Sequence, residues 1–166
     1  MKKDVLITIK GTQNIFEDNQ GETIEFITNG QYHCRAGNKI ISYNETELTG
    51  LAGVLTTVKV EGNERVTITR SGKHKSQLIL EKGTRHLCHY TTAFGDIIMG
   101  VKTANIISNL NNCGGEITAQ YSLELNHSIA SDNSFNISIK EANYSNGQSN
   151  SYSWKSTKRK IVESIQ

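Results

Sequence analysis

The sequence predicts an all-β protein, folded as a single antiparallel up-and-down β-barrel with a polar C-terminal extension. The chain holds 19 Ile, 7 Val and 16 Thr against 10 Leu and 7 Ala, and β-branched side chains favour strands over helices. Apolar and polar residues alternate with a period of two in many short runs. Clusters of Gly, Asn and Asp separate these runs, which is typical of tight turns between antiparallel strands.

The N-terminal part of the chain predicts four strands, at residues 5–10, 23–28, 31–36 and 39–46. Val5, Ile7 and Ile9 share one face of the first. We place turns within 17–21, at Asn29-Gly30 and at Gly37-Asn38, because Asn-Gly is the strongest short signal of a β-hairpin.

The middle of the chain predicts four more strands, at residues 54–60, 66–70, 77–81 and 85–92. Gly62-Asn63, Ser71-Gly72 and Lys82-Gly83 separate them as turns. No convincing helix lies between these runs, so neighbouring strands are expected to pair antiparallel rather than through parallel crossovers.

The last runs are 96–103, which continues toward Leu110, then 117–125 and 135–139. The run 117–125 has the cleanest alternation in the chain. We expect one set of its side chains to face the interior and the other to face water. The interior set is Ile117, Ala119, Tyr121, Leu123 and Leu125, and the outer set is Glu116, Thr118, Gln120, Ser122 and Glu124.

Length and tail composition predict one domain over residues 1–142 and a polar, basic tail over 143–166. About ten strands in one sheet would curl, and closure removes exposed edges, so a barrel is favoured over a sandwich. Residues 153–163 of the tail are compatible with a short amphipathic helix. The absence of an apolar leader and of a run of roughly 20 apolar residues predicts a cytoplasmic protein without a membrane span.

Three cysteines, Cys34, Cys88 and Cys113, lack the dense spacing of a disulfide scaffold, so we expect free thiols. The segment 86–89, His-Leu-Cys-His, is the nearest approach to a metal site, together with His33. Adjacent and i, i+2 spacings do not select tetrahedral coordination, so no metal and no cofactor are predicted.

Charge is uneven along the chain. Residues 59–89 carry seven Lys or Arg against three Glu, and residues 155–160 of the tail add four more basic residues. Such regions are compatible with a module that contacts an acidic protein or RNA, which is our alternative hypothesis. The net charge of +2 does not predict a nucleic-acid-binding surface over the whole domain.

Two charged residues continue apolar faces. Glu45 follows Ile41 and Tyr43, and Arg70 follows Val66 and Ile68. A charge inside a barrel is costly unless it is paired or bound by a ligand, so we expect the two to meet there as an ion pair or to serve as polar anchors for a small ligand. The residues assigned to this candidate ligand site are Tyr43, Glu45, Arg70, His86, Tyr90, Lys102 and Tyr121.

A resemblance to a known family adds to this reading. The segments 41–51, 59–62, 69–72, 76–77, 81–83, 101–103, 114–117 and 121–124 resemble, in order and spacing, the YwiB-like family of domains of unknown function, known from low-GC Gram-positive bacteria. The resemblance covers about residues 3–141 and implies a lipocalin-like, or calycin, β-barrel. It implies no activity and no catalytic residues.

No catalytic motif occurs in the sequence: there is no GxSxG, P-loop, HExxH or paired CxxC. We therefore expect a cytoplasmic protein that is not an enzyme and that binds a small molecule in the barrel interior or mouth. The sequence predicts no membrane partner and leaves the oligomeric state open.

Overall fold

The structure is a computed structural model, and it describes residues 2–16, 20–92 and 95–142. The expected tail and its helix lie outside these residues. Ten strands are found within the described part. They are β1 (Lys3–Ile15), β2 (Gln20–Arg35), β3 (Asn38–Asn44), β4 (Val54–Glu61), β5 (Arg65–Gly72), β6 (Ser76–Glu81), β7 (Arg85–Thr92), β8 (Gly95–Ser108), β9 (Gly114–Leu125) and β10 (Ser128–Glu141). A short 3-10 helix, η1 (Glu47–Thr49), lies between β3 and β4.

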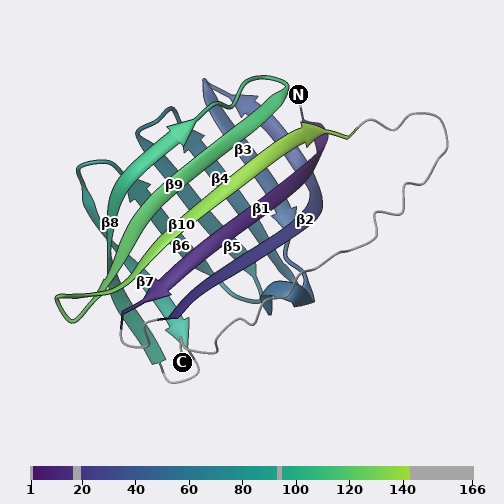
Figure 1. Cartoon of the computed structure of the whole chain (residues 1–166). Helices are drawn as coiled ribbons and strands as arrows, with labels where there is room; N and C mark the ends of the chain where they lie inside the picture. Colours follow the sequence, from purple (N-terminus) through teal and green to yellow (C-terminus); the bar gives the residue numbers. More distant parts are fainter. Residues whose placement is uncertain (1, 17–19, 93–94, 143–166) are drawn as a thin grey trace.

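The strands form one antiparallel sheet that curls into a nearly closed barrel (Figure 1). Their order is β6-β5-β4-β3-β2-β1-β10-β9-β8-β7, so strands that follow each other in the chain pair, except β6 and β7, and β1 also pairs with β10. The expected up-and-down barrel is confirmed. No helix in the described part is long and apolar enough to cross a membrane.

The barrel wall has its seam between β6 and β7, which follow each other in the chain but form no ladder. Isolated bridges and side chains span this seam instead: the Cys88 thiol donates a hydrogen bond to the carbonyl oxygen of Gln77 over 3.3 Å. Chain ends usually mark the break in a meander. Here the long β1–β10 ladder, from Val5–Glu141 to Ile15–Ser131, closes the ends and moves the break to the middle of the chain.

One predicted turn is wrong. Asn29-Gly30 lies inside β2, where Gly30 pairs with Val5 on one side and Tyr43 on the other. Gly30 is required for close packing, because a Cβ there would overlap the Ile7 side chain and the backbone of Ser42. The glycine is therefore needed where neighbouring strands approach closely. In the sequence alone, a glycine used in this way cannot be told from one that makes a turn.

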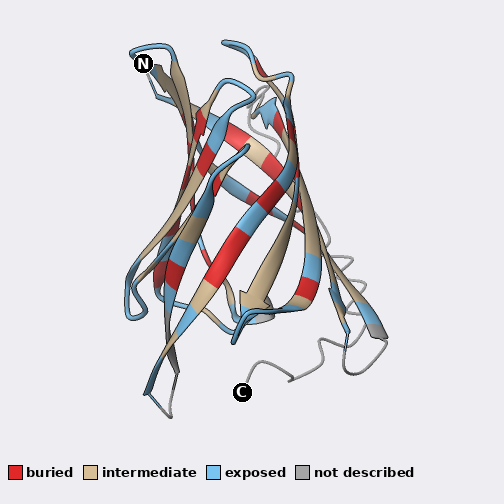
Figure 2. Ribbon diagram, turned by 90° about the vertical axis from the view of Figure 1, so that its left-hand side faces the viewer, coloured by how far each residue is buried: buried red, intermediate tan, exposed pale blue. Residues whose placement is uncertain are grey.

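Burial alternates along the strands, as the bands in Figure 2 show. In β9, Ile117 and Ala119 are fully buried, and Tyr121 and Leu123 pack against the core. Leu125, expected inside, is 39% exposed because it ends the strand, at the turn into β10. The core is largely aliphatic and is built from the inward faces of all ten described strands.

Candidate functional site

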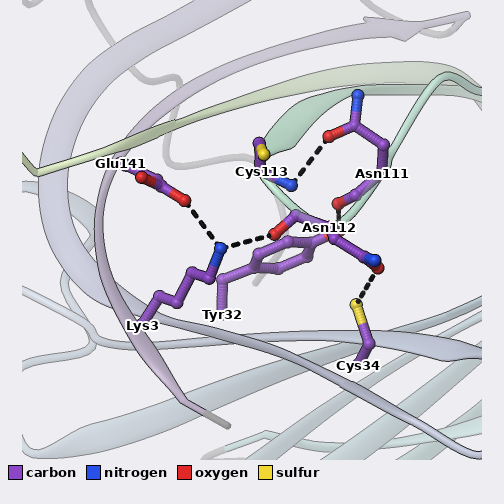
Figure 3. Close-up of polar contacts among 7 residues, drawn as sticks. All are labelled: Lys3, Tyr32, Cys34, Asn111, Asn112, Cys113 and Glu141. Carbon is purple, nitrogen blue, oxygen red and sulfur yellow. Dashed lines mark hydrogen bonds and ion pairs between the residues drawn. The ribbon is translucent and has the colours of Figure 1, made fainter.

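At one end of the barrel the turn between β8 and β9 is bonded to β1 and β2 (Figure 3). We call this the sealed end and define it by Lys3, Tyr32, Cys34 and residues 109–113. The Tyr32 hydroxyl, on a side chain only 1% exposed, donates to the Asn111 carbonyl oxygen over 2.5 Å. The Lys3 ammonium donates to the Asn112 carbonyl oxygen over 3.0 Å. The Cys34 thiol donates to the Asn112 side-chain oxygen over 3.3 Å. These bonds tie the turn to β1 and β2.

Polar groups at the sealed end satisfy one another. Lys3 also pairs with Glu141 at 2.7 Å, and Lys39 contacts the Cys34 sulfur at 3.3 Å. Burial, the first cause, and the nearby thiols raise the pKa of Tyr32, so its hydroxyl stays protonated as a donor. A recess of about 240 Å³ remains there, and Lys3, Tyr32, Cys34 and Asn112 of its lining take part in the bonds to the turn. We assign this end a structural role.

The opposite part of the interior contains the residues of interest, which we call the Arg70 cluster: Tyr43, Arg70, Cys88 and Tyr121. The strand register places Tyr43 and Arg70 in one row across the sheet. Tyr43 of β3 pairs with Thr56 of β4, which in turn pairs with Arg70 of β5. Arg70 shares the inward face of Val66 and Ile68. Its positive charge acts on Tyr43, Cys88 and Tyr121, which come from three other strands.

Arg70 is the unusual member of the cluster. Its Nε atom is buried without a hydrogen-bond partner. Across the part of the chain that the structure describes, the guanidinium makes no hydrogen bond and no ion pair with an acid. An unpaired cation in a protein interior is costly, and proteins almost always give such a group a partner.

Glu45 is buried close by, 6% exposed, just beyond the end of β3. Thr56 donates to one of its carboxylate oxygens over 2.7 Å, and Thr49 of η1 donates to the other over 2.9 Å. The predicted ion pair between Glu45 and Arg70 is wrong, since the two make no contact within 4.0 Å in the described structure. The reason is that two threonines, 4 and 11 residues further along the chain, already satisfy the carboxylate.

The electrostatics of the cluster follow from its burial. Desolvation raises the pKa of Tyr121 to about 12, against the opposing effect of the Arg70 charge. Burial, with the Glu45 carboxylate second, raises the pKa of Tyr43 above its usual value. Burial also raises the pKa of the Cys88 thiol, again opposed by Arg70. All three groups are therefore neutral near pH 7, and Arg70 is the charged member of the cluster.

Apolar rings flank the cluster on two sides. Phe26 meets Tyr43 edge to face, with ring centroids 6.4 Å apart, and Phe135 meets Tyr121 in the same way at 6.3 Å. Thr103 pairs with Tyr121 across β8 and β9, and its buried hydroxyl also has no hydrogen-bond partner. Among the described residues, the cluster thus has a cation whose buried Nε atom lacks a partner, with aromatic rings beside Tyr43 and Tyr121.

The other predicted site residues lie elsewhere. Lys102 is exposed on the outer face, where it pairs in register with Arg85, so its assignment to the interior is wrong. Its position is even-numbered on a strand whose inward residues, Val101 and Thr103, are odd-numbered. His86 lies at the seam, its Nε2 atom 3.5 Å from the Glu81 carboxylate. The backbone of Tyr90 pairs with Ile97, and its side chain lies outside the described set.

The cysteines are free thiols, and Cys88 is buried. In the described part of the chain, no three His, Cys, Asp or Glu side chains converge as metal ligands would. A groove of about 340 Å³ on the outer wall, lined by short polar side chains such as Ser122 and Asp132, was not foreseen. The Ser122 hydroxyl donates to the Asp132 carboxylate over 2.7 Å, so the acid in this groove already has a hydrogen-bond partner there.

Of the basic residues at 59–89, Arg70 faces the interior, whereas Arg65, Lys73, Lys75 and Arg85 are exposed. Arg65 and Lys59 contact Glu61, and Arg85 contacts Glu124 at 2.7 Å. Acidic neighbours therefore neutralise part of this region. The alternative hypothesis of an RNA or protein interaction module stays a prediction, and the basic tail on which it also depends lies outside the described residues.

Fold and site define an antiparallel β-barrel with a cation on its inward face that has no partner among the residues the structure describes. Residues 7–137 match the model of a family described as a domain of unknown function, DUF1934, and the chain belongs to this family. A relative, the uncharacterized beta-barrel protein YwiB of Bacillus subtilis (strain 168), is 31% identical over 125 residues, which are 75% of this chain and 86% of the relative.

The fold is also similar to a solved structure, the crystal structure of ywiB protein from Bacillus subtilis. The TM-score is 0.73 at 25% identity, over 86% of this chain and 94% of that one. The family resemblance and the barrel expected from the sequence are confirmed.

Proposed function

We propose that this protein binds a small molecule inside its barrel, at the Arg70 cluster, and that it does so without transforming the ligand. The observation that carries the proposal is the buried Nε atom of Arg70, which has no partner in the described structure. Within the described residues, two hydroxyls donate to the nearby Glu45 carboxylate and no group bonds to Arg70. A ligand that bonds to Arg70 would remove the cost of this unpaired charge.

The raised pKa values of Cys88 and Tyr121 favour a binding role over a catalytic one. The Cys88 thiol donates to a backbone carbonyl oxygen at the seam and has a raised pKa, so it remains a thiol and a poor nucleophile. Tyr121 has its pKa raised to about 12, far from the range of a general base at pH 7. A cytoplasmic location and a relationship to lipocalins remain predictions from the sequence.

Native mass spectrometry of the full-length protein, purified from cells of its source organism, tests the proposal. We expect a fraction of the protein to carry a non-covalent small molecule, and we expect Arg70→Met to lose it. Arg65→Met is the matched control, because Arg65 lies on the same strand but points outward to Glu61. The proposal is contradicted if the wild-type protein is detected only at the mass of the polypeptide, or if Arg70→Met carries the same adduct to the same extent.

A further inference from the structure

We infer that two copies of this chain associate as a symmetric dimer through the outer face of β7, β8, β9 and β10. We call this surface the β7–β10 face. It lies on the opposite side of the barrel wall from the Arg70 cluster, so the dimer goes beyond the proposed function and does not depend on it. Strand register, exposed apolar side chains and charge each support the dimer.

Two rows of outward positions, set by the strand register, define the β7–β10 face. In the order β7, β8, β9, β10, the first row is Leu87, Gly100, Glu124 and Ile129. In the same order, the second row is Arg85, Lys102, Ser122 and Asp132. The strands β8, β9 and β10 lie side by side in Figure 1. Neighbouring positions of a row are therefore about 5 Å apart.

The first row exposes apolar side chains at both of its ends. Leu87 and Ile129 are 60% and 51% exposed. Ile98, the outward residue of β8 next to Gly100, adds a third side chain that is 54% exposed. An exposed apolar residue that stands alone among polar partners is normal, as Leu55 of β4 does. Three such residues on one face indicate a surface that is covered by a partner.

Both rows complement themselves when the strand order is reversed. A two-fold axis that runs along the strands, between β8 and β9, lays β7 of one copy over β10 of the other and β8 over β9. Leu87 then meets Ile129, and Arg85 meets Asp132, on both sides of the axis. The strands of the two copies stay aligned, which is a normal arrangement of sheets packed face to face. Self-complementarity of this kind favours a second copy over an unrelated partner.

The centre of the face carries one charge of each sign. Arg85 crosses β8 above Gly100, where an added Cβ would overlap the guanidinium, and its Nε donates to the Glu124 carboxylate over 2.7 Å. Because β8 of one copy lies over β9 of the other, each guanidinium also faces Glu124 of the other copy. The two ion pairs then form a ring of alternating charges about the axis, which holds the copies in register.

The outer groove gives room for a long basic side chain. It holds about 340 Å³, and Asp132 is the one charged residue among those that line it. The wall is therefore hollowed beside the axis, so the curvature of the barrel does not keep the copies apart. Lys102 is exposed and forms no ion pair with another described residue. The axis places Lys102 over Ser122 of the other copy, next to Asp132, so each copy supplies the cation that the groove of the other lacks.

Sedimentation equilibrium of the full-length protein tests the dimer. Over roughly 1 to 300 μM, a range in which small interfaces dissociate, we expect a reversible equilibrium between monomer and dimer that weakens as salt screens the charges. Leu87→Ser should weaken dimerisation by roughly 10- to 100-fold, because each dimer loses two apolar contacts. Leu55→Ser changes an exposed leucine outside the face, so it is the matched control and should dimerise as the wild type does.

Charge reversal tests the two-fold arrangement. Arg85→Glu leaves two acids at the centre of the face and Glu124→Arg leaves two bases, so each variant repels its own copies. We expect each variant alone to be monomeric and an equimolar mixture of the two to form a heterodimer. Arg65→Glu is the control, because Arg65 pairs with Glu61 outside the face. Circular dichroism checks that every variant keeps its strands.

The inference is contradicted if the wild-type protein stays monomeric over the whole concentration range. A dimer that persists in both charge-reversed variants also contradicts it, because that dimer uses another face. If each variant is monomeric and their mixture is monomeric too, the two-fold arrangement is wrong. None of these variants alters Arg70, so their results do not bear on the proposed function.

Discussion

The sealed end and the Arg70 cluster contain similar groups, a tyrosine, a cation and a thiol, but they differ in how these groups are satisfied. At the sealed end, Tyr32, Lys3 and Cys34 each donate to the turn that closes the barrel. In the Arg70 cluster, Arg70 has no partner in the described structure. A saturated polar network stabilises a fold, whereas an unsaturated one leaves bonding capacity for something outside the chain.

The largest expected effect comes from Tyr32. Tyr32→Ala removes a fully buried ring together with its bond to Asn111, and we expect a loss of about 3 to 5 kcal/mol in the free energy of unfolding. Tyr32→Phe keeps the ring and should lose only about 1 kcal/mol. Urea denaturation followed by circular dichroism measures both. A loss below about 1 kcal/mol for Tyr32→Ala would show that the sealed end does not hold the fold together.

Arg70→Met should act in the opposite direction. An ion pair with Glu45 would have made this change cost about 3 to 5 kcal/mol, but the two residues form no such pair, and the replacement removes a half-buried charge whose Nε atom is buried without a partner among the described residues. We expect the ligand-free protein to gain about 1 kcal/mol or more in free energy of unfolding. The same denaturation experiment, on protein refolded without ligand, measures it. A loss of several kcal/mol would mean that Arg70 has a structural partner.

The pH dependence of stability tests the burial of the Tyr121 phenol in the Arg70 cluster. Its pKa is about 10 in an unfolded chain and is raised to about 12 in the barrel, so the folded state holds this proton more tightly. The contribution to stability is complete below about pH 10 and is lost as the pH rises through about 12. Tyr121→Phe should flatten this decline, as denaturation at several pH values would show. Absorbance at 295 nm should show a phenol ionising near pH 12 in wild type and absent in the variant.

The smallest effect is expected from Lys3, a half-exposed residue of the sealed end. Its pair with Glu141 lies in solvent, where screening and side-chain entropy cancel most of the attraction. Lys3→Met should therefore leave the denaturation midpoint unchanged within error, in contrast to Tyr32→Ala. A clear loss of stability would show that the bond from Lys3 to the Asn112 carbonyl oxygen, rather than the Tyr32 ring, holds the turn in place.

Much of the fold was predictable from the sequence because strand alternation is a local property. The period of two placed Ile117 and Ala119 inside and Gln120 outside, and the structure confirms this. The same parity placed Glu45 and Arg70 on inward faces, and the family segments predicted the barrel. Side chains point to alternate faces whatever the rest of the chain does, so these predictions need no knowledge of the neighbouring strands.

Tertiary structure alone decided the position of the seam, the role of Gly30 and the partners of the interior charges. Parity states that Glu45 and Arg70 face inward but not which groups they meet, because that depends on register and on how the sheet curls. Thr49 and Thr56 reach Glu45 first, and Arg70 is left among Tyr43, Cys88 and Tyr121 from three strands far apart in sequence. The alternating sequence therefore determined that Arg70 faces the inside of the barrel, and the closure of the sheet decided that Glu45 does not pair with it.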